Sequence, residues 1–290
     1  MALLIPSGTI SQNLTEAAMK SLIAETLGLR FSPVAVTRTS VRPPKALQFK
    51  EGKRACAMYL FACAAQGRTA VADRATCGCV GGAAGFGFGD TYQNFPGGVK
   101  GFCGFLSSGN AGTEEGRALG EALSARSASF GHHYLHGEGY KRSPELVRQW
   151  HESLPFTQEA PAFVSFRPLA EVRPEEGDVP DAVSFVVDAD RLSALVVLAN
   201  YASPRSDRVT IPFSSGCQSV GLLAFAEADS PSPRAVVGLT DLSARKAVRR
   251  SLGAESLTFT MPWKLFLEME ENAPGCFFDR PTFKELMDRA

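Results

Sequence analysis

Apolar side chains recur at helical spacing in several segments of the chain. Leu14, Ala18 and Leu22 fall on one face of a predicted amphipathic helix over residues 11–27, which is followed by a glycine. Thr113, followed by two glutamates, has the pattern of a helix N-terminus. Further helices are predicted over residues 54–66, 190–200 and 243–252.

Short apolar runs between these helices predict β-strands over residues 33–39, 70–72, 182–187 and 208–213. Residues 42–53 and 173–180 have the proline and charge content of surface loops. Because strands and helices alternate along the chain, the sequence predicts an α/β fold with mixed sheets, with α+β as the alternative.

The order strand, helix, strand, Gly-Cys turn, strand occurs twice. When the two occurrences are laid over each other, Gly78-Cys79 falls on Gly216-Cys217. We therefore predict two related halves, residues 1–160 and 161–290, which either form separate domains or pack as one body. The alternative is a chance similarity of two α/β units. If the duplication is real, we expect the two Gly-Cys turns to face one another.

Composition restricts the classes of partner. The 290 residues include 44% apolar residues, enough for a full core, and 30 basic residues balance 30 acidic ones. This balance predicts no nucleic-acid or membrane partner, and the chain shows neither a secretory signal nor a run of about 20 apolar residues. We expect a cytoplasmic protein whose cysteines are free thiols. The oligomeric state stays open.

Five of the seven cysteines lie between residues 56 and 103. Cys56 begins a predicted helix, where backbone amides favour a thiolate, and Cys77 and Cys79 flank a glycine in a turn. No second Cys pair has zinc-ribbon spacing, so a metal centre would have to take ligands from distant segments, such as Cys56, Cys77 or Cys79, Cys103 and Cys217. The alternative is that most of these cysteines are core residues. Cys63 and Cys276 are predicted to pack in the core.

A Gly-rich stretch over residues 81–89 follows the Cys77–Cys79 turn. Gly81, Gly82 and Gly85 are candidate cofactor-binding residues, because they allow the backbone to approach a ligand and their amides to bind an anion. The stretch matches neither the dinucleotide-binding fingerprint nor the P-loop. Tight packing around a turn explains the glycines equally well.

Three of the four histidines, His132, His133 and His136, cluster between two glycines. The flanking glycines favour a loop, and H-E-x-x-H is absent, so we predict an exposed or locally hydrogen-bonded cluster rather than a metal site.

Several short motifs carry a resemblance to a known family. They are Leu27-Gly-Leu before Pro33-Val-Ala-Val, Cys56 at a helix start, Ala64-Ala-Gln-Gly, Cys77 before Gly81-Gly, Val179-Pro-Asp-Ala-Val-Ser-Phe, and Ser215-Gly-Cys217. Over most of its length the chain resembles the uncharacterised DUF169 family, which is common in anaerobic bacteria and archaea and has no established activity. The resemblance implies that Cys56, Cys77 and Cys217 occupy recurrent cysteine positions, and the anaerobic setting favours an iron–sulfur centre.

The sequence thus favours a metal- or iron–sulfur-cluster-binding protein, with Cys56, Cys77 and Cys217 as ligands and Cys79 or Cys103 as a fourth. One alternative is a thiol-dependent enzyme that uses Cys77 or Cys56 as nucleophile and one of the clustered histidines as base. Another is a non-catalytic binder of a small molecule, in which the Gly-rich stretch contacts the ligand and the cysteines only pack. The expected partner is therefore a metal or a small molecule.

Overall fold

The computed structural model describes residues 19–53, 55–156 and 159–288, and a seven-stranded mixed sheet forms its centre. The strand order is β2-β3-β1-β4-β7-β6-β5; β5 pairs parallel with β6 and the other neighbours pair antiparallel. The α/β class with a mixed sheet is therefore confirmed. The strands are β1 (Val34–Thr39), β2 (Ala70–Asp73), β3 (Phe163–Pro168), β4 (Ala182–Val187), β5 (Val209–Thr210), β6 (Ala235–Gly238) and β7 (Leu257–Pro262).

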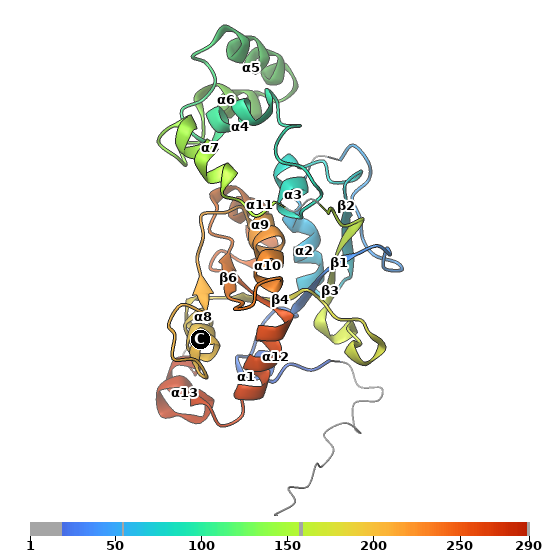
Figure 1. The fold of residues 1–290 in the computed structure, drawn as a ribbon, viewed down its shortest axis with the longest axis vertical. Helices are drawn as coiled ribbons and strands as arrows, with labels where there is room; N and C mark the ends of the chain where they lie inside the picture. The colour runs from blue at the N-terminus through green and yellow to red at the C-terminus, as the bar shows by residue number, and fades with distance from the viewer. Residues whose placement is uncertain (1–18, 54, 157–158, 289–290) are drawn as a thin grey trace, which may run out of the picture.

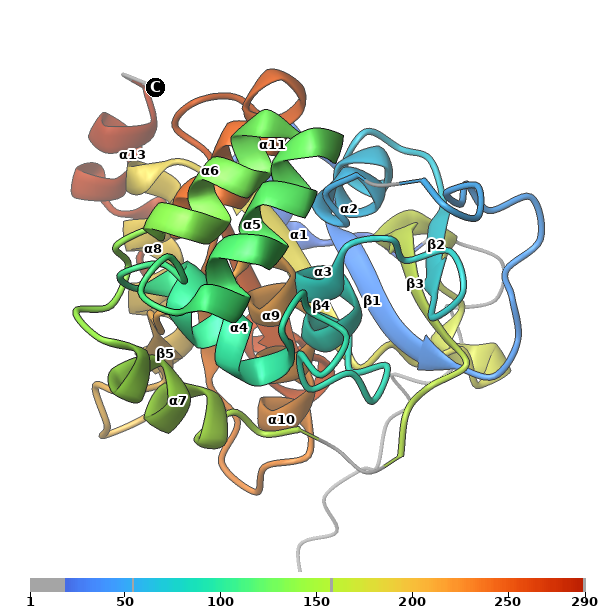
Figure 2. The ribbon, with the colours of Figure 1, turned by 90° about the horizontal axis from the view of Figure 1, so that it is seen from above.

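Helices cover both faces of the sheet (Figures 1 and 2). They are α1 (Leu22–Thr26), α2 (Met58–Ala65), α3 (Val80–Gly85), α4 (Gly98–Leu106), α5 (Glu114–Arg126), α6 (Ala128–His136), α7 (Pro144–Glu152), α8 (Ala189–Asn200), α9 (Gly216–Val220), α10 (Leu222–Ala228), α11 (Leu242–Leu252), α12 (Trp263–Asn272) and α13 (Pro281–Met287). Short 3-10 turns occur at Leu169–Glu171, Pro174–Glu176 and Phe277–Asp279.

The alternation of side chains along each strand builds two apolar cores. Val34 and Val36 of β1 point to the face covered by α2, α3 and α9–α11, whereas Ala35 points to the face covered by α1, α8, α12 and α13. On the first face Phe86 packs against Phe166, with 5.1 Å between ring centroids. Both faces of the central strands are thus buried.

Helices α4–α7 form a third unit, which we call the helical lobe (residues 98–152). Figure 1 shows it at one end of the long axis, above the sheet and the helices that cover it, which we call the sheet body. The lobe has its own apolar cluster around Phe102, Tyr134 and Val147. The Trp150 indole N–H donates to the Phe213 carbonyl at 3.1 Å and so ties the lobe to the sheet body.

Most elements predicted from apolar spacing are present. The predicted strands at 33–39, 70–72 and 182–187 are β1, β2 and β4, and Thr113 caps α5 by accepting a hydrogen bond from the Gly116 amide. The predicted strand at 208–213 is confined to the two residues of β5. Of the helix predicted over 11–27, the structure has Leu22–Thr26, and residues 11–18 lie outside the described residues.

The loop predicted around the three clustered histidines is wrong, because these residues form the end of α6. Gly131, read as a loop residue, instead allows α5 and α6 to approach closely. A Cβ at this position would lie 2.0 Å from the Ser124 Oγ. The glycine therefore serves helix packing rather than a turn.

The strand order repeats across the centre of the sheet. In the order β2-β3-β1, the strand β3 is antiparallel to both neighbours, and in the order β6-β7-β4 the strand β7 is likewise antiparallel to both. The two sets meet at the antiparallel pair β1–β4. Strand β3 belongs to the first set, although it lies beyond residue 160, the predicted boundary between the two halves. The Gly-Cys turns hold different places in this order, since Gly78-Cys79 follows β2 and Gly216-Cys217 precedes β6.

Helix α3 packs against the starts of α2 and α9 through its glycines. A Cβ on Gly82 would lie 2.6 Å from the Ala57 Cβ, and a Cβ on Gly85 would lie 2.8 Å from the Cys217 Sγ and 2.9 Å from the backbone of Cys217. By contrast, a Cβ on Gly81 would meet only the Cys79 Sγ, at 4.0 Å. Helix α3, absent from the sequence-based prediction, is thus specified by close packing.

Gly85→Ala and Gly81→Ala are a matched pair that tests this packing. We expect Gly85→Ala to lower the free energy of unfolding by about 1–3 kcal/mol, because the backbone of α9 must move. Gly81→Ala should leave this free energy unchanged or raise it by up to about 1 kcal/mol, through the higher helix propensity of alanine. Urea titration of both variants measures the difference, and equal stability of the two would contradict the assigned packing.

Candidate functional site

A cavity of about 800 Å³ lies between the sheet body and the helical lobe. One wall comes from the starts of α2, α3, α9 and α11, and the opposite wall comes from α4–α6, Trp150 of α7 and the segment before α4. Its size lies within the range of small-molecule sites in proteins, roughly 300–1,000 Å³.

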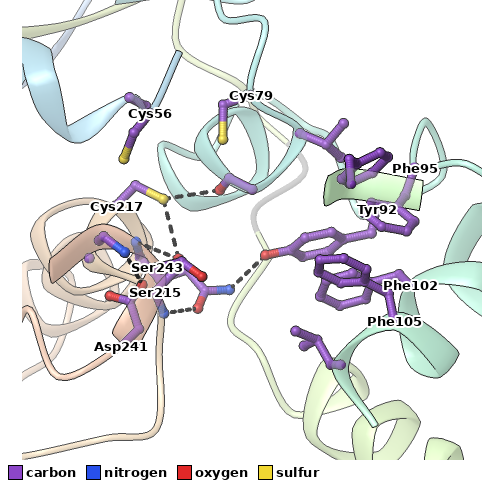
Figure 3. Close-up of a pocket in the computed structure, with 18 of the residues that line it drawn as sticks. Cys56, Cys79, Tyr92, Phe95, Phe102, Phe105, Ser215, Cys217, Asp241 and Ser243 are labelled. Atoms are coloured by element: carbon purple, nitrogen blue, oxygen red, sulfur yellow. Dashed lines mark hydrogen bonds between the residues drawn. The ribbon is translucent and has the colours of Figure 1, made fainter. Parts of the chain in front are cut away.

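Three thiols line the sheet-body wall. Cys56 directly precedes the first turn of α2, Cys79 is the N-cap of α3, and Cys217 lies in the first turn of α9. In Figure 3 the three sulfurs point toward the same space. Residues separated by as many as 161 positions in the chain are thus brought to one place, because α2, α3 and α9 pack side by side.

Hydrogen bonds fix two of these thiols. The Cys79 Sγ accepts from the Gly82 amide at 3.3 Å, and the Cys217 Sγ lies 3.1 Å from the Gly81 carbonyl and 3.2 Å from the Ser215 Oγ (Figure 3). Only 7% of Cys217 is exposed. The thiol of Cys217 is therefore held in place by the turn that carries Cys79.

Burial raises the pKa of two of these thiols, Cys56 and Cys217. It raises the pKa of Cys56 to about 11, and the Met58 amide opposes the rise. It also raises the pKa of Cys217 well above its ordinary value, and the charges of Cys79 and Cys56 add to this rise. Because each thiolate disfavours its neighbours, the group is poorly suited to hold several negative charges without a cation.

The opposite wall, formed by the lobe and the segment before α4, is aromatic and aliphatic. Tyr92 stacks on Phe102 with 3.8 Å between ring centroids, and Phe95 packs edge-on against Phe102 (Figure 3). The wall continues through Phe105, Leu106, Leu119, Leu123, Phe130 and Trp150. The cavity therefore has a thiol-bearing end and an apolar body.

Tyr92 links the two walls. Its backbone has φ +65, an unfavourable value for a bulky residue, and the buried Asp90 carboxylate accepts a hydrogen bond from its amide. This conformation places the Tyr92 hydroxyl 3.2 Å from the Gln218 Nε2, which donates to it. Nothing in the sequence around Tyr92 signals this role.

Asp241 and Ser214 also line the thiol end and were absent from the sequence-based candidates. Asp241 caps α11 by accepting a hydrogen bond from the Ala244 amide at 2.7 Å. Burial raises its pKa, and the amides of Ala244 and Gly216 oppose the rise. An aspartate before a helix is a common cap, so its second use as a cavity residue leaves no separate mark in the sequence.

The remaining cysteines lie away from the cavity lining. Cys77 is buried behind Cys79, in the core that contains α2, and its thiol contacts the Cys79 carbonyl at 3.6 Å. Cys103 is buried in the core of the lobe and Cys276 in the core on the other sheet face, while Cys63 is partly buried at the end of α2. All seven cysteines are free thiols.

Only some of the other residues predicted for the site lie in the cavity wall. Gly81 lines the cavity, whereas Gly82 and Gly85 lie in the helix packing described above. His132, His133 and His136 are not among the described residues that line the cavity. His133 is hydrogen-bonded to Glu138, and the rings of His132 and His136 lie 4.5 Å apart on α6.

Two features are absent from the part of the chain that the structure describes. Within residues 19–53, 55–156 and 159–288, no group of three or more His, Cys, Asp or Glu side chains is arranged to hold a metal ion. The helices in the same part of the chain are also too short or too polar to span a membrane.

In a comparison with known proteins, one family model covers all the residues that line the cavity. No curated protein and no solved structure matched the chain. A family model described as uncharacterised ArCR matches residues 22–272, which include β1–β7 and every residue that lines the cavity. The chain therefore belongs to the DUF169 family.

Proposed function

We propose that this protein binds a largely apolar small molecule in the cavity, with the polar end of that molecule against Cys56, Cys79 and Cys217. The observation that carries the proposal is the division of the cavity into an apolar body and an end where thiols, hydroxyls and a carboxylate converge. Such a pocket, mostly apolar with a few convergent polar groups, is the usual form of a small-molecule site.

Burial of an apolar occupant supplies the affinity in this proposal. The rings of Phe102, Phe105 and Trp150 give the cavity an apolar surface. Removal of such surface from water contributes roughly 25 cal/mol per Å² to the free energy of binding. The thiol end then orients the occupant. This division of roles explains why aromatic residues of the lobe face polar residues of the sheet body.

A second candidate is a thiolate-bound metal or iron–sulfur centre at the same three cysteines. It is favoured by the convergence of the three sulfurs in Figure 3 and by their mutual effect on thiol pKa. A bound cation would replace the thiol protons and remove the repulsion between thiolates. A metal centre held by three cysteines would keep one coordination position open toward the cavity. Cys77 would not be a ligand unless the turn that carries Cys77 and Cys79 moved. Because no single-ion arrangement exists among the described side chains, a multi-atom cluster or a rearrangement of the sulfurs is required.

The thiol-dependent enzyme is less well supported. A nucleophilic cysteine needs a base or a lowered pKa, whereas burial raises the pKa of Cys56, and the clustered histidines lie outside the described cavity lining.

The cavity proposal is tested by filling the cavity. Leu123→Trp enlarges a side chain on the apolar wall, and Leu146→Trp makes the same change at a residue of α7 that is 39% exposed and outside the lining. The probe is N-phenyl-1-naphthylamine, a neutral dye that fluoresces in apolar sites. We expect saturable binding by the native protein, at least about tenfold weaker binding by Leu123→Trp because the volume is lost, and unchanged binding by Leu146→Trp. Equal affinity of Leu123→Trp and the native protein would contradict the proposal.

The metal proposal is tested by purifying the protein without oxygen and measuring its metal content and visible absorbance. We expect stoichiometric iron or zinc in the native protein and in Cys63→Ser, whose changed residue lies outside the cavity lining. The triple variant Cys56→Ser, Cys79→Ser, Cys217→Ser should lose it, because serine is a poor ligand for soft metals. Colourless native protein without stoichiometric iron or zinc would remove this candidate.

The raised thiol pKa predicts the pH dependence of alkylation at Cys56. In chelator-treated native protein, the rate with iodoacetamide should rise about tenfold per pH unit from pH 8 to pH 10, because the thiolate fraction grows in this way below the pKa. In urea the same cysteine should react much faster at pH 8, since an exposed thiol has its ordinary pKa. Peptide mass spectrometry measures both rates. Native labelling at pH 8 that is as fast as labelling in urea would show that Cys56 is an activated thiol.

A further inference from the structure

A second cavity lies beside α11, and its volume is about 410 Å³. One wall is the face of α11 that carries Leu242, Lys246 and Arg249, and the other is the turn of residues 253–256 between α11 and β7. We call it the basic pocket. Among the described residues, none lines both this pocket and the cavity beneath the lobe, so the two are separate sites.

Positive charge dominates the basic pocket. Its described lining has three basic side chains, Arg245, Lys246 and Arg249, and one acidic side chain, Glu255. Lys246 and Arg249 are both exposed, and neither forms an ion pair within the part of the chain that the structure describes. An anion that enters the pocket can therefore reach two cations that no carboxylate of the described chain neutralises.

The third cation, Arg245, is fixed by the backbone. Its Nη1 donates to the carbonyls of Leu239 and Ser256 at 3.0 and 2.9 Å, and its Nη2 donates to the Ala254 carbonyl. Arg245 also lowers the pKa of Asp241, so that carboxylate balances part of its charge. Lys246 and Arg249 are thus the groups that bind an anion directly, while Arg245 adds a fixed positive charge to the wall.

Leu239 holds one of these carbonyls in an unfavourable backbone conformation. Its φ is +57, a value that is rare for a bulky side chain, and the residue lines the pocket. Strained backbone of this kind is concentrated at binding and catalytic sites, where the surrounding structure maintains it. The conformation of Leu239 is therefore a second observation, independent of charge, that favours a binding site here.

The pocket also has an apolar edge. Leu242 is 66% exposed at the start of α11, and it lies on the same helical face as Lys246 and Arg249. An apolar group of a ligand that covers Leu242 would remove this surface from water. The charges favour phosphate over a carboxylate, because phosphate carries up to two negative charges and has enough acceptor oxygens for both an ammonium and a guanidinium.

From this arrangement we propose that the basic pocket binds a small phosphate monoester. The phosphate lies between Lys246 and Arg249, and the organic part of the molecule lies against Leu242. This site is additional to the cavity beneath the lobe, and it does not depend on the function proposed for that cavity.

The test uses inorganic phosphate, phenyl phosphate and benzoate as probes, and calorimetry on the full chain at low salt measures their affinities. We expect phenyl phosphate to bind about three- to tenfold more tightly than inorganic phosphate, because its ring covers Leu242. It should bind at least about tenfold more tightly than benzoate, which carries a single charge.

Variants of exposed residues assign the binding to the pocket. Lys246→Gln and Arg249→Gln should each weaken both phosphates by about three- to tenfold. Arg250→Gln is the matched control, because it removes the same charge from an exposed residue of α11 that does not line the pocket, and it should leave the affinities unchanged.

Two further variants separate the parts of the ligand. Leu242→Ala should remove the preference for phenyl phosphate over inorganic phosphate and leave the affinity for inorganic phosphate unchanged. Glu255→Gln should strengthen the binding of both phosphates, because it removes a like charge from the pocket.

Four outcomes would overturn the proposal. The first is no saturable binding of phenyl phosphate up to about 10 mM. The second is an equal loss of affinity in Arg249→Gln and Arg250→Gln, which would show a response to net charge alone. The third is equal affinity for all three probes. The fourth is loss of phenyl phosphate binding in Leu123→Trp, which would place this probe in the cavity beneath the lobe.

Discussion

The approach of α3 to the start of α9 is the constraint on which the site depends. Gly85 lies against Cys217 so closely that a Cβ would overlap its sulfur, and the Gly81 carbonyl lies 3.1 Å from the same sulfur. This contact brings the turn after β2 to the start of α9. Without it, Cys79 and Cys217 would belong to separate surfaces of the sheet body.

Because the lobe covers the three thiols, they line a cavity rather than an open surface. Its aromatic residues face the starts of four helices, and Tyr92 joins the two sides through its hydrogen bond with Gln218. Thiols, an aspartate and serine hydroxyls then lie at one end of an apolar space. In the proposed function, the apolar space buries the body of the occupant and the few polar groups orient it.

Much of the fold follows from local pattern, whereas the site depends on tertiary contacts. Apolar spacing predicts β1, β4, α8 and α11 because the two strands bury both faces and the two helices bury one face in a core. It fails at Gly131 and over α3, where glycines that resemble loop residues allow helices to touch. Among the cysteines, the sequence singled out Cys56 and Cys217, but the preference for Cys77 over Cys79 depends on the direction of side chains in a turn. Spacing along the chain does not encode this direction.

The two sets of strands have a similar order, and the segments that precede and follow the outer strand of each set contribute residues to the cavity wall. Cys56 and Cys217 each begin a helix that comes before the outer strand of its set, while Cys79 and Asp241 each cap the helix that comes after it. In an assembly of two identical chains, such places would carry identical residues. Because both sets belong to one polypeptide, the two positions can carry different residues. One holds a thiol and the other a carboxylate. The cavity wall thus differs in chemistry at these two positions, with a thiol at Cys79 and a carboxylate at Asp241.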